Sequence, residues 1–167
     1  MSETGSKTYS SDATYVPESD GTVKWVVGDE YNIKLSGEQS HGTLSFVVAT
    51  VPPGNGPVAH IHENSDEAFY LIEGELEFLN GETILTAKAG DFIFVPRGTR
   101  HRFKNRSPRP TKMVFLFTPA GPEQFFLRYG DDPLPGHEPE LWTAERFTPQ
   151  MLEFSRKLGT VQAPEPE

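Results

Sequence analysis

The chain has 167 residues, a formal net charge of −9 at pH 7 and no cysteine. This length suits one buried core and is short for two. The acidic balance disfavours nucleic acid and anionic membranes as general partners, because their phosphate groups would be repelled. The lack of cysteine excludes disulfides, thiolate catalysis and cysteine-ligated metal centres. No secretory signal or apolar run of membrane-spanning length is visible, so we expect a soluble cytoplasmic protein.

The elements expected from the N-terminus onwards are a tail and then many short strands. Residues 1–20 are rich in Ser and Thr without periodicity, which predicts a flexible tail. Between residues 23 and 119, short segments rich in branched and aromatic residues alternate with turn signals. The predicted strands are Val23–Val27, Tyr31–Leu35, Thr43–Val51, Val58–His62, Glu67–Ile72, Glu75–Leu79, Thr83–Lys88, Asp91–Val95, His101–Asn105 and Lys112–Thr118. Short strands without intervening helices favour a sandwich or a closed barrel.

After Pro119 the pattern becomes helical. Residues 122–130 begin with Pro and end with Gly, which is typical of a short helix. Residues 148–159 combine a Thr-Pro start, apolar spacing and a Gly stop. Residues 161–167 have the composition of a second flexible tail. The predicted organisation is therefore an N-terminal tail (1–20), a barrel (21–119), a C-terminal helical extension (120–160) and a C-terminal tail (161–167).

Three of the five histidines have the spacing of metal ligands. His60 and His62 lie two apart on a predicted strand, so their rings leave the same face and can close on one ion. Glu67 follows on the next strand, and the turn-prone residues 63–65 between them would bring it back to the inward face. His101 opens a later strand, directly after a turn segment. A His-x-His pair alone is more often a half-buried hydrogen-bonding pair, so the prediction depends on the whole set.

These residues also match two motifs of a known family. Gly54, His60-x-His62, Glu67 and Gly74 resemble the first cupin motif in type and spacing, and Gly90, Pro96-x-Gly98, His101 and Asn105 resemble the second. The resemblance implies an all-β fold, a double-stranded β-helix (a jelly-roll barrel), here followed by two short C-terminal α-helices. It also implies a metal held by His60, His62, Glu67 and His101.

A narrower resemblance concerns activity. The Pro-Ala-Gly run that leads into Phe125-Phe126 is similar to single-domain cupins grouped with the quercetin dioxygenases. This implies a metal-dependent dioxygenase that acts on a flavonol-like, aromatic or polyketide-type enol or phenol, with Glu67 as the catalytic base. Three imidazoles and a carboxylate suit one divalent transition metal per chain: Fe, Ni, Mn, Co or Zn. Four protein ligands leave a position open, as in catalytic sites.

Strand alternation indicates an aromatic cavity around the metal. Phe69 shares a face with Glu67, Phe103 shares one with His101, and Phe92 and Phe94 share one in the strand between, with Phe115 or Phe117 beside them. Such a cavity suits an apolar or aromatic substrate.

Two other functions stay open at this point. One is Lewis-acid isomerisation, cyclisation or dehydration of an enolisable molecule, and the other is non-catalytic binding of a small molecule. The family resemblance and the amphipathic C-terminal helices predict a homodimer.

Overall fold

The computed structural model describes residues 12–166. Its strands are β1 (Thr22–Val26), β2 (Asp29–Leu35), β3 (Ser45–Val51), β4 (His60–His62), β5 (Asp66–Glu73), β6 (Glu75–Asn80), β7 (Thr83–Lys88), β8 (Phe92–Val95), β9 (His101–Lys104), β10 (Thr111–Thr118) and β11 (Thr160–Gln162). Its helices are α1 (Glu123–Tyr129), the 3₁₀ helix η1 (Ala144–Arg146) and α2 (Pro149–Lys157). All ten predicted strands and both predicted α-helices are present.

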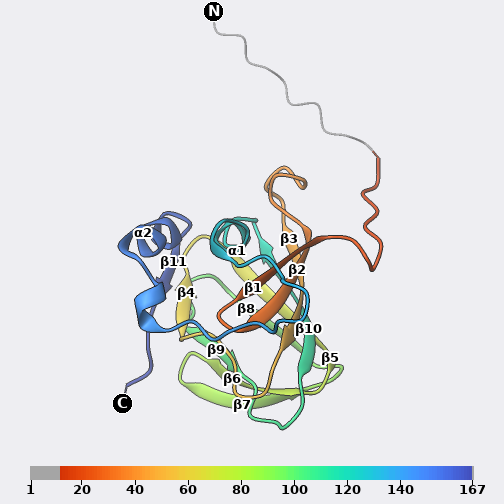
Figure 1. Cartoon of the computed structure of the whole chain (residues 1–167). Helices are drawn as coiled ribbons and strands as arrows, with labels where there is room; N and C mark the ends of the chain where they lie inside the picture. The colour runs from red at the N-terminus through yellow and green to blue at the C-terminus, as the bar shows by residue number, and fades with distance from the viewer. Residues whose placement is uncertain (1–11, 167) are drawn as a thin grey trace, which may run out of the picture.

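The strands form two antiparallel sheets (Figure 1). The order is β1-β2-β3-β10-β5-β8 in the six-stranded sheet and β11-β4-β9-β6-β7 in the five-stranded sheet. Several strands that are neighbours in a sheet are distant in sequence. For example, β10 lies between β3 and β5, and β9 lies between β4 and β6. The predicted double-stranded β-helix is confirmed. Among the described helices, none has the length and apolar character needed to cross a membrane.

The core lies between the two sheets and is strongly aromatic. Strands β3 and β10 alternate buried and less buried residues along their length, as strands with one face on a core do. The largest fully buried aromatic side chains are Phe69, Phe78, Phe115 and Phe117. Phe69 contacts Phe78 edge-to-face, with ring centroids 5.0 Å apart, and so joins the two sheets.

The expectation that Phe92 and Phe94 face the cavity is wrong. Both lie on the outer face of the edge strand β8, where Phe92 is 64% and Phe94 51% exposed. Val95 pairs with Glu67 in the ladder between β5 and β8, and its side chain is buried in the core. Alternation correctly placed the two phenylalanines on one face, but it does not say which face of a strand points inward.

The C-terminal end also differs from expectation. Residues 160–162, which the sequence analysis divides between the helical extension and the flexible tail, form β11, and β11 pairs antiparallel with β4. Beyond it, Glu165 forms an ion pair with the buried Arg102, with Oε2 2.6 Å from Nε. The ladder and the ion pair together hold this segment on the barrel.

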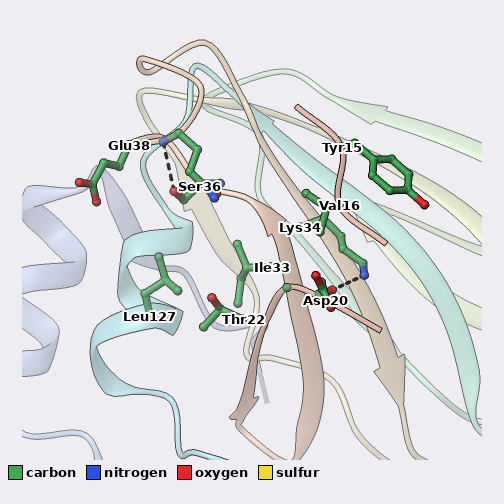
Figure 2. Close-up of a pocket in the computed structure, with 11 residues that line it drawn as sticks. Tyr15, Val16, Asp20, Thr22, Ile33, Lys34, Ser36, Glu38 and Leu127 are labelled. Atoms are coloured by element: carbon green, nitrogen blue, oxygen red, sulfur yellow. Dashed lines mark hydrogen bonds between the residues drawn. The ribbon is translucent and has the colours of Figure 1, made fainter. Parts of the chain in front are cut away.

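Of the predicted N-terminal tail, residues 1–11 lie outside the described residues. The described part, residues 12–20, forms no helix or strand but is attached to β2. Lys34 of β2 donates hydrogen bonds to the carbonyl oxygens of Pro17, Glu18 and Asp20. This contact forms one wall of a pocket between the N-terminal segment, β2 and α1 (Figure 2). Because the three donors of its ammonium group are already used, Lys34 serves the fold here.

Helix α1 is joined to the barrel by one buried carboxylate. Glu123 is 0% exposed, and its two oxygens accept hydrogen bonds from the backbone N–H groups of Gly37 and Gly121, at 2.8 and 2.7 Å. Gly37 belongs to the loop between β2 and β3, so this side chain connects the start of α1 to that loop.

We therefore expect Glu123→Ala to destabilise the protein by about 1–3 kcal/mol, because two partly buried N–H groups lose a carboxylate acceptor. Urea denaturation followed by circular dichroism measures the change. The control is Glu38→Ala, which removes an exposed carboxylate from the same loop as Gly37. Equal stability of the two variants would contradict this role of Glu123.

Candidate metal centre

The four predicted ligands come together from both sheets. His60 and His62 lie on β4, and His101 begins the neighbouring strand β9, with His60 opposite His101. Glu67 lies on β5 in the other sheet. Residues 63–65 therefore connect one sheet to the other. This crossing is the physical reason that Glu67, five residues after His62, still points to the same interior.

The side chains are close enough to act on one ion. Oε2 of Glu67 lies 2.7 Å from Nε2 of His101 and 3.1 Å from Nε2 of His62. The donor atoms of all four residues lie within 4.8 Å of one another. His62, Glu67 and His101 are buried, and His60 is partly buried. Three imidazole nitrogens and a carboxylate oxygen converging in this way fit a divalent transition metal.

The far side of each imidazole ring is held by a hydrogen bond. Nδ1 of His60 lies 2.8 Å from the carbonyl oxygen of Val58, and Nδ1 of His101 lies 2.9 Å from that of Thr99. A carbonyl can only accept, so each Nδ1 carries a hydrogen and each Nε2 is left to bind an ion. This arrangement of outer partners is the one that orients histidine ligands in metal sites.

His62 has a different partner, which sequence analysis missed. Its Nδ1 lies 2.9 Å from the hydroxyl oxygen of Thr160 on β11. The two residues are 98 positions apart, and Thr160 lies at the end of a segment expected to be helical. No signal in the sequence pairs these residues, because the contact exists only when β11 adds to β4.

The electrostatics of the cluster favour an ionised carboxylate. Burial by itself raises the pKa of Glu67, but the charge of His62 and hydrogen bonds from His101 and His62 outweigh it and lower the pKa to about 2. For His60, burial and the charges of His101 and His62 lower the pKa to about 3, so this ring is neutral at pH 7.

His101 is shifted in the other direction. Burial lowers its pKa, but the hydrogen bond and the charge of Glu67 raise it above its ordinary value. Its Nε2 must lose a proton before it can bind an ion, so metal binding at this cluster would release a proton and weaken as the pH falls.

A cavity of about 300 Å³ opens onto the cluster. His60, His62 and Glu67 form part of its wall. Most of the remaining wall is apolar and aromatic, with side chains from Phe103, Phe115, Phe117, Phe125, Phe126, Trp142 and Phe147. Phe103, Phe115 and Phe117 were expected there, whereas Phe69 belongs to the core beneath. Trp142 and Phe147 were not expected, because the sequence places them in a connector between two helices.

Fold and cluster together define a barrel protein with a three-histidine, one-glutamate centre at the base of an aromatic cavity. Residues 47–117 match the family model of the cupin domain. The chain is 33% identical to quercetin 2,3-dioxygenase of Bacillus subtilis over 150 residues, 89% of this chain and 42% of that protein. The chain belongs to the cupin superfamily.

Two further similarities concern one more curated protein and one solved structure. Over 84 residues the chain is 37% identical to the tetracenomycin polyketide synthase protein TcmJ of Streptomyces glaucescens, covering 50% of this chain and 56% of that protein. A structure described as a predicted oxalate decarboxylase from Thermotoga maritima superposes with a TM-score of 0.59 at 25% identity, covering 63% of this chain and 98% of that one. The chain spans about half the length of the curated relatives it matches.

The partner of His62 provides a test of the centre. In Thr160→Val, a methyl group replaces the hydroxyl and the shape is kept, so Nδ1 of His62 loses its hydrogen-bond acceptor. We expect metal affinity to fall about 10- to 100-fold, as is usual when such a partner is removed. Competition with a chromogenic chelator measures the affinity.

The matched control is Thr83→Val, at an exposed position on the edge strand β7. It should leave metal affinity unchanged. If Thr160→Val binds metal as tightly as the wild type, Thr160 does not support the metal centre.

Proposed function

We propose that this chain is a metal-dependent dioxygenase that acts on a flavonol-like, aromatic or polyketide-type enol or phenol. The observation that carries the proposal is the aromatic cavity that opens directly onto His60, His62 and Glu67. Similarity to a quercetin dioxygenase over most of the chain supports it. We further propose that His60, His62, Glu67 and His101 hold one divalent transition metal per chain.

The metal, when bound, supplies Lewis acidity and, if it is redox-active, electron exchange with O₂. The residues of the chain supply the rest. Aromatic side chains from β10 and α1, such as Phe117 and Phe126, offer faces and edges against which a flat substrate can pack. The same side chains exclude water, which strengthens every charge interaction at the cluster.

Glu67 is the group we propose to take the enol proton, on a carboxylate oxygen. With a pKa of about 2 it is a weak base, because His62 and His101 stabilise its ionised form. The transfer becomes favourable when the substrate arrives, since the oxyanion formed there replaces the negative charge that Glu67 loses. The proton thus moves from the substrate to Glu67, and the negative charge moves from Glu67 to the substrate oxygen. The total charge of the cluster and the substrate is unchanged.

A second function has its own support. In it, the same cluster and cavity isomerise, cyclise or dehydrate an enolisable molecule without redox chemistry. Similarity to the polyketide synthase protein TcmJ supports a polyketide-type substrate of this kind. Both functions use the proton transfer to Glu67, and they differ in their need for O₂.

Oxygen consumption separates the two functions. With metal-loaded protein and quercetin as the test substrate, we expect O₂ uptake that the His101→Ala variant lacks, because that variant loses a ligand. An oxygen electrode measures the rate for each candidate metal. Turnover of an enolisable substrate without O₂ and with Zn would support the second function instead. Binding without turnover under either condition would reject both and indicate a binding protein.

The role of Glu67 is tested by Glu67→Gln. The amide can still offer an oxygen to an ion but cannot take a proton, so we expect turnover to fall by about two to four orders of magnitude. Metal content, measured in the same samples by mass spectrometry, should stay close to that of the wild type. The control Glu73→Gln changes the exposed end of the same strand. Near-normal turnover in metal-loaded Glu67→Gln would leave Glu67 as a ligand only.

The cytoplasmic location and the homodimer expected from the sequence stay predictions. One reason for expecting the dimer was the amphipathic character of the C-terminal helices, whose apolar faces need a surface to cover them. In the structure, Phe126 of α1 and Leu152 of α2 line the cavity, and Met151 is buried. Both helices therefore already pack on the barrel.

A further inference from the structure

A second polar side chain, outside the four-residue cluster, lines the cavity. Tyr31 lines the cavity together with His60 and Glu67, and its side chain is almost fully buried, at 4% exposure. It lies on β2, in the sheet opposite β4 and β9. The side chains around it are apolar: its ring makes edge contacts with Phe115 and Phe126, at centroid distances of 5.2 and 4.9 Å.

The hydroxyl of Tyr31 is paired with a buried carboxylate. Its oxygen lies 3.2 Å from Oδ2 of Asp29, two residues earlier on the same face of β2. Asp29 is 0% exposed, and its other oxygen makes no hydrogen bond of normal geometry among residues 12–166, although the side chain of Asn55 lies close enough to lower its pKa. A carboxylate in such a place is costly when ionised.

The burial of the pair supports a change in the protonation of Asp29 near neutral pH. Burial raises the pKa of Asp29 to about 7, although Tyr31, Asn55 and the charge of Lys104 act in the opposite direction. Burial and the charges of Asp29 and Glu67 raise the pKa of Tyr31 well above its ordinary value, so the phenol keeps its proton. Asp29 is therefore the member of the pair that changes charge.

The charge of Asp29 decides where the hydroxyl hydrogen of Tyr31 points. An ionised carboxylate can only accept, so it takes the phenolic hydrogen. A protonated carboxyl can donate to the phenolic oxygen instead, which frees the phenolic hydrogen for another acceptor. The ring contacts of Tyr31, Phe115 and Phe126, offer no acceptor, and Tyr31 lines the cavity, so we take an acceptor oxygen on a molecule in the cavity as its partner.

We propose that Tyr31 is a ligand-binding residue that donates a hydrogen bond to an acceptor oxygen on the part of an aromatic ligand remote from the metal cluster, and that Asp29 controls this donor. The inference rests on the proposed function for the enol at the metal end. It adds that the ligand carries a second oxygen, a carbonyl or a phenol, on its far side. It also predicts tighter binding below neutral pH, where Asp29 is protonated.

The test uses two probes that need neither metal nor O₂. Acetophenone and ethylbenzene have similar shapes and differ in the carbonyl oxygen, and NMR titration gives a dissociation constant for each. We expect the wild type to prefer acetophenone at pH 6, and Tyr31→Phe to reduce that preference by about 3- to 10-fold, the range of one hydrogen bond. The control Tyr70→Phe removes the same atom from a half-exposed ring on β5, outside the cavity.

The pH dependence tests Asp29. The preference of the wild type for acetophenone should decrease from pH 6 to pH 8, as Asp29 ionises and retains the phenolic hydrogen. The Asp29→Asn variant cannot ionise at this position, so its preference for acetophenone should be the same at pH 6 and pH 8. If Tyr31→Phe fails to fold, this pH dependence still tests the inference.

Several outcomes would overturn the inference. They are a wild type without preference for acetophenone, an unchanged preference in Tyr31→Phe, and a pH-dependent preference in Asp29→Asn. Absence of O₂ uptake together with an intact, Tyr31-dependent preference would instead reject only the proposed function, because the probes are not enols.

Discussion

The contact of Glu67 with His62 and His101 is the interaction around which the candidate site of this molecule is built. It joins the two sheets through polar groups in an interior that is mostly apolar. Burying these groups costs free energy, which is offset only by their mutual contacts and by the hydrogen bonds on the far side of each ring. Apolar side chains of similar size would pack there without that cost. A barrel whose core already contains Phe69, Phe78 and Phe115 does not need the cluster for stability, which is why we assign it to chemistry.

Two parts of the chain contribute different residues to the candidate site. The barrel strands β4, β5 and β9 carry the four clustered residues. The cavity above them is completed by residues that follow the barrel, from α1, the connector around Trp142 and α2. A common barrel can therefore offer one type of centre, while the segment after it shapes the space that a substrate must fill. This is the physical reason that the fold alone does not identify the substrate.

Two buried carboxylates in the same interior respond to it in opposite ways. Glu67 is surrounded by imidazoles that can be positively charged, and they hold it in the ionised form. Asp29 has a phenol on one oxygen and no hydrogen bond of normal geometry among residues 12–166 on the other, and burial raises its pKa towards neutrality. Pairs of titratable groups whose pKa values are moved apart by their surroundings are a common basis for separate roles in one site. Here the difference separates an ionised carboxylate at the centre from a carboxyl group that changes charge near neutral pH.

The sequence by itself determined most of the architecture and the composition of the cluster. Strand alternation, turn residues and helix ends are local signals, so all ten barrel strands and both α-helices could be predicted. The spacing of His60, His62, Glu67 and His101 around turns was informative for the same reason. Only the tertiary structure decided that Phe92 and Phe94 face outward, because alternation says which residues share a face and not which face is buried. It alone decided the contact of Thr160 with His62, since a three-residue strand has no stable form until the edge of β4 offers its backbone hydrogen bonds. The pairing of Tyr31 with a buried Asp29 likewise depends on burial, which other segments of the chain create.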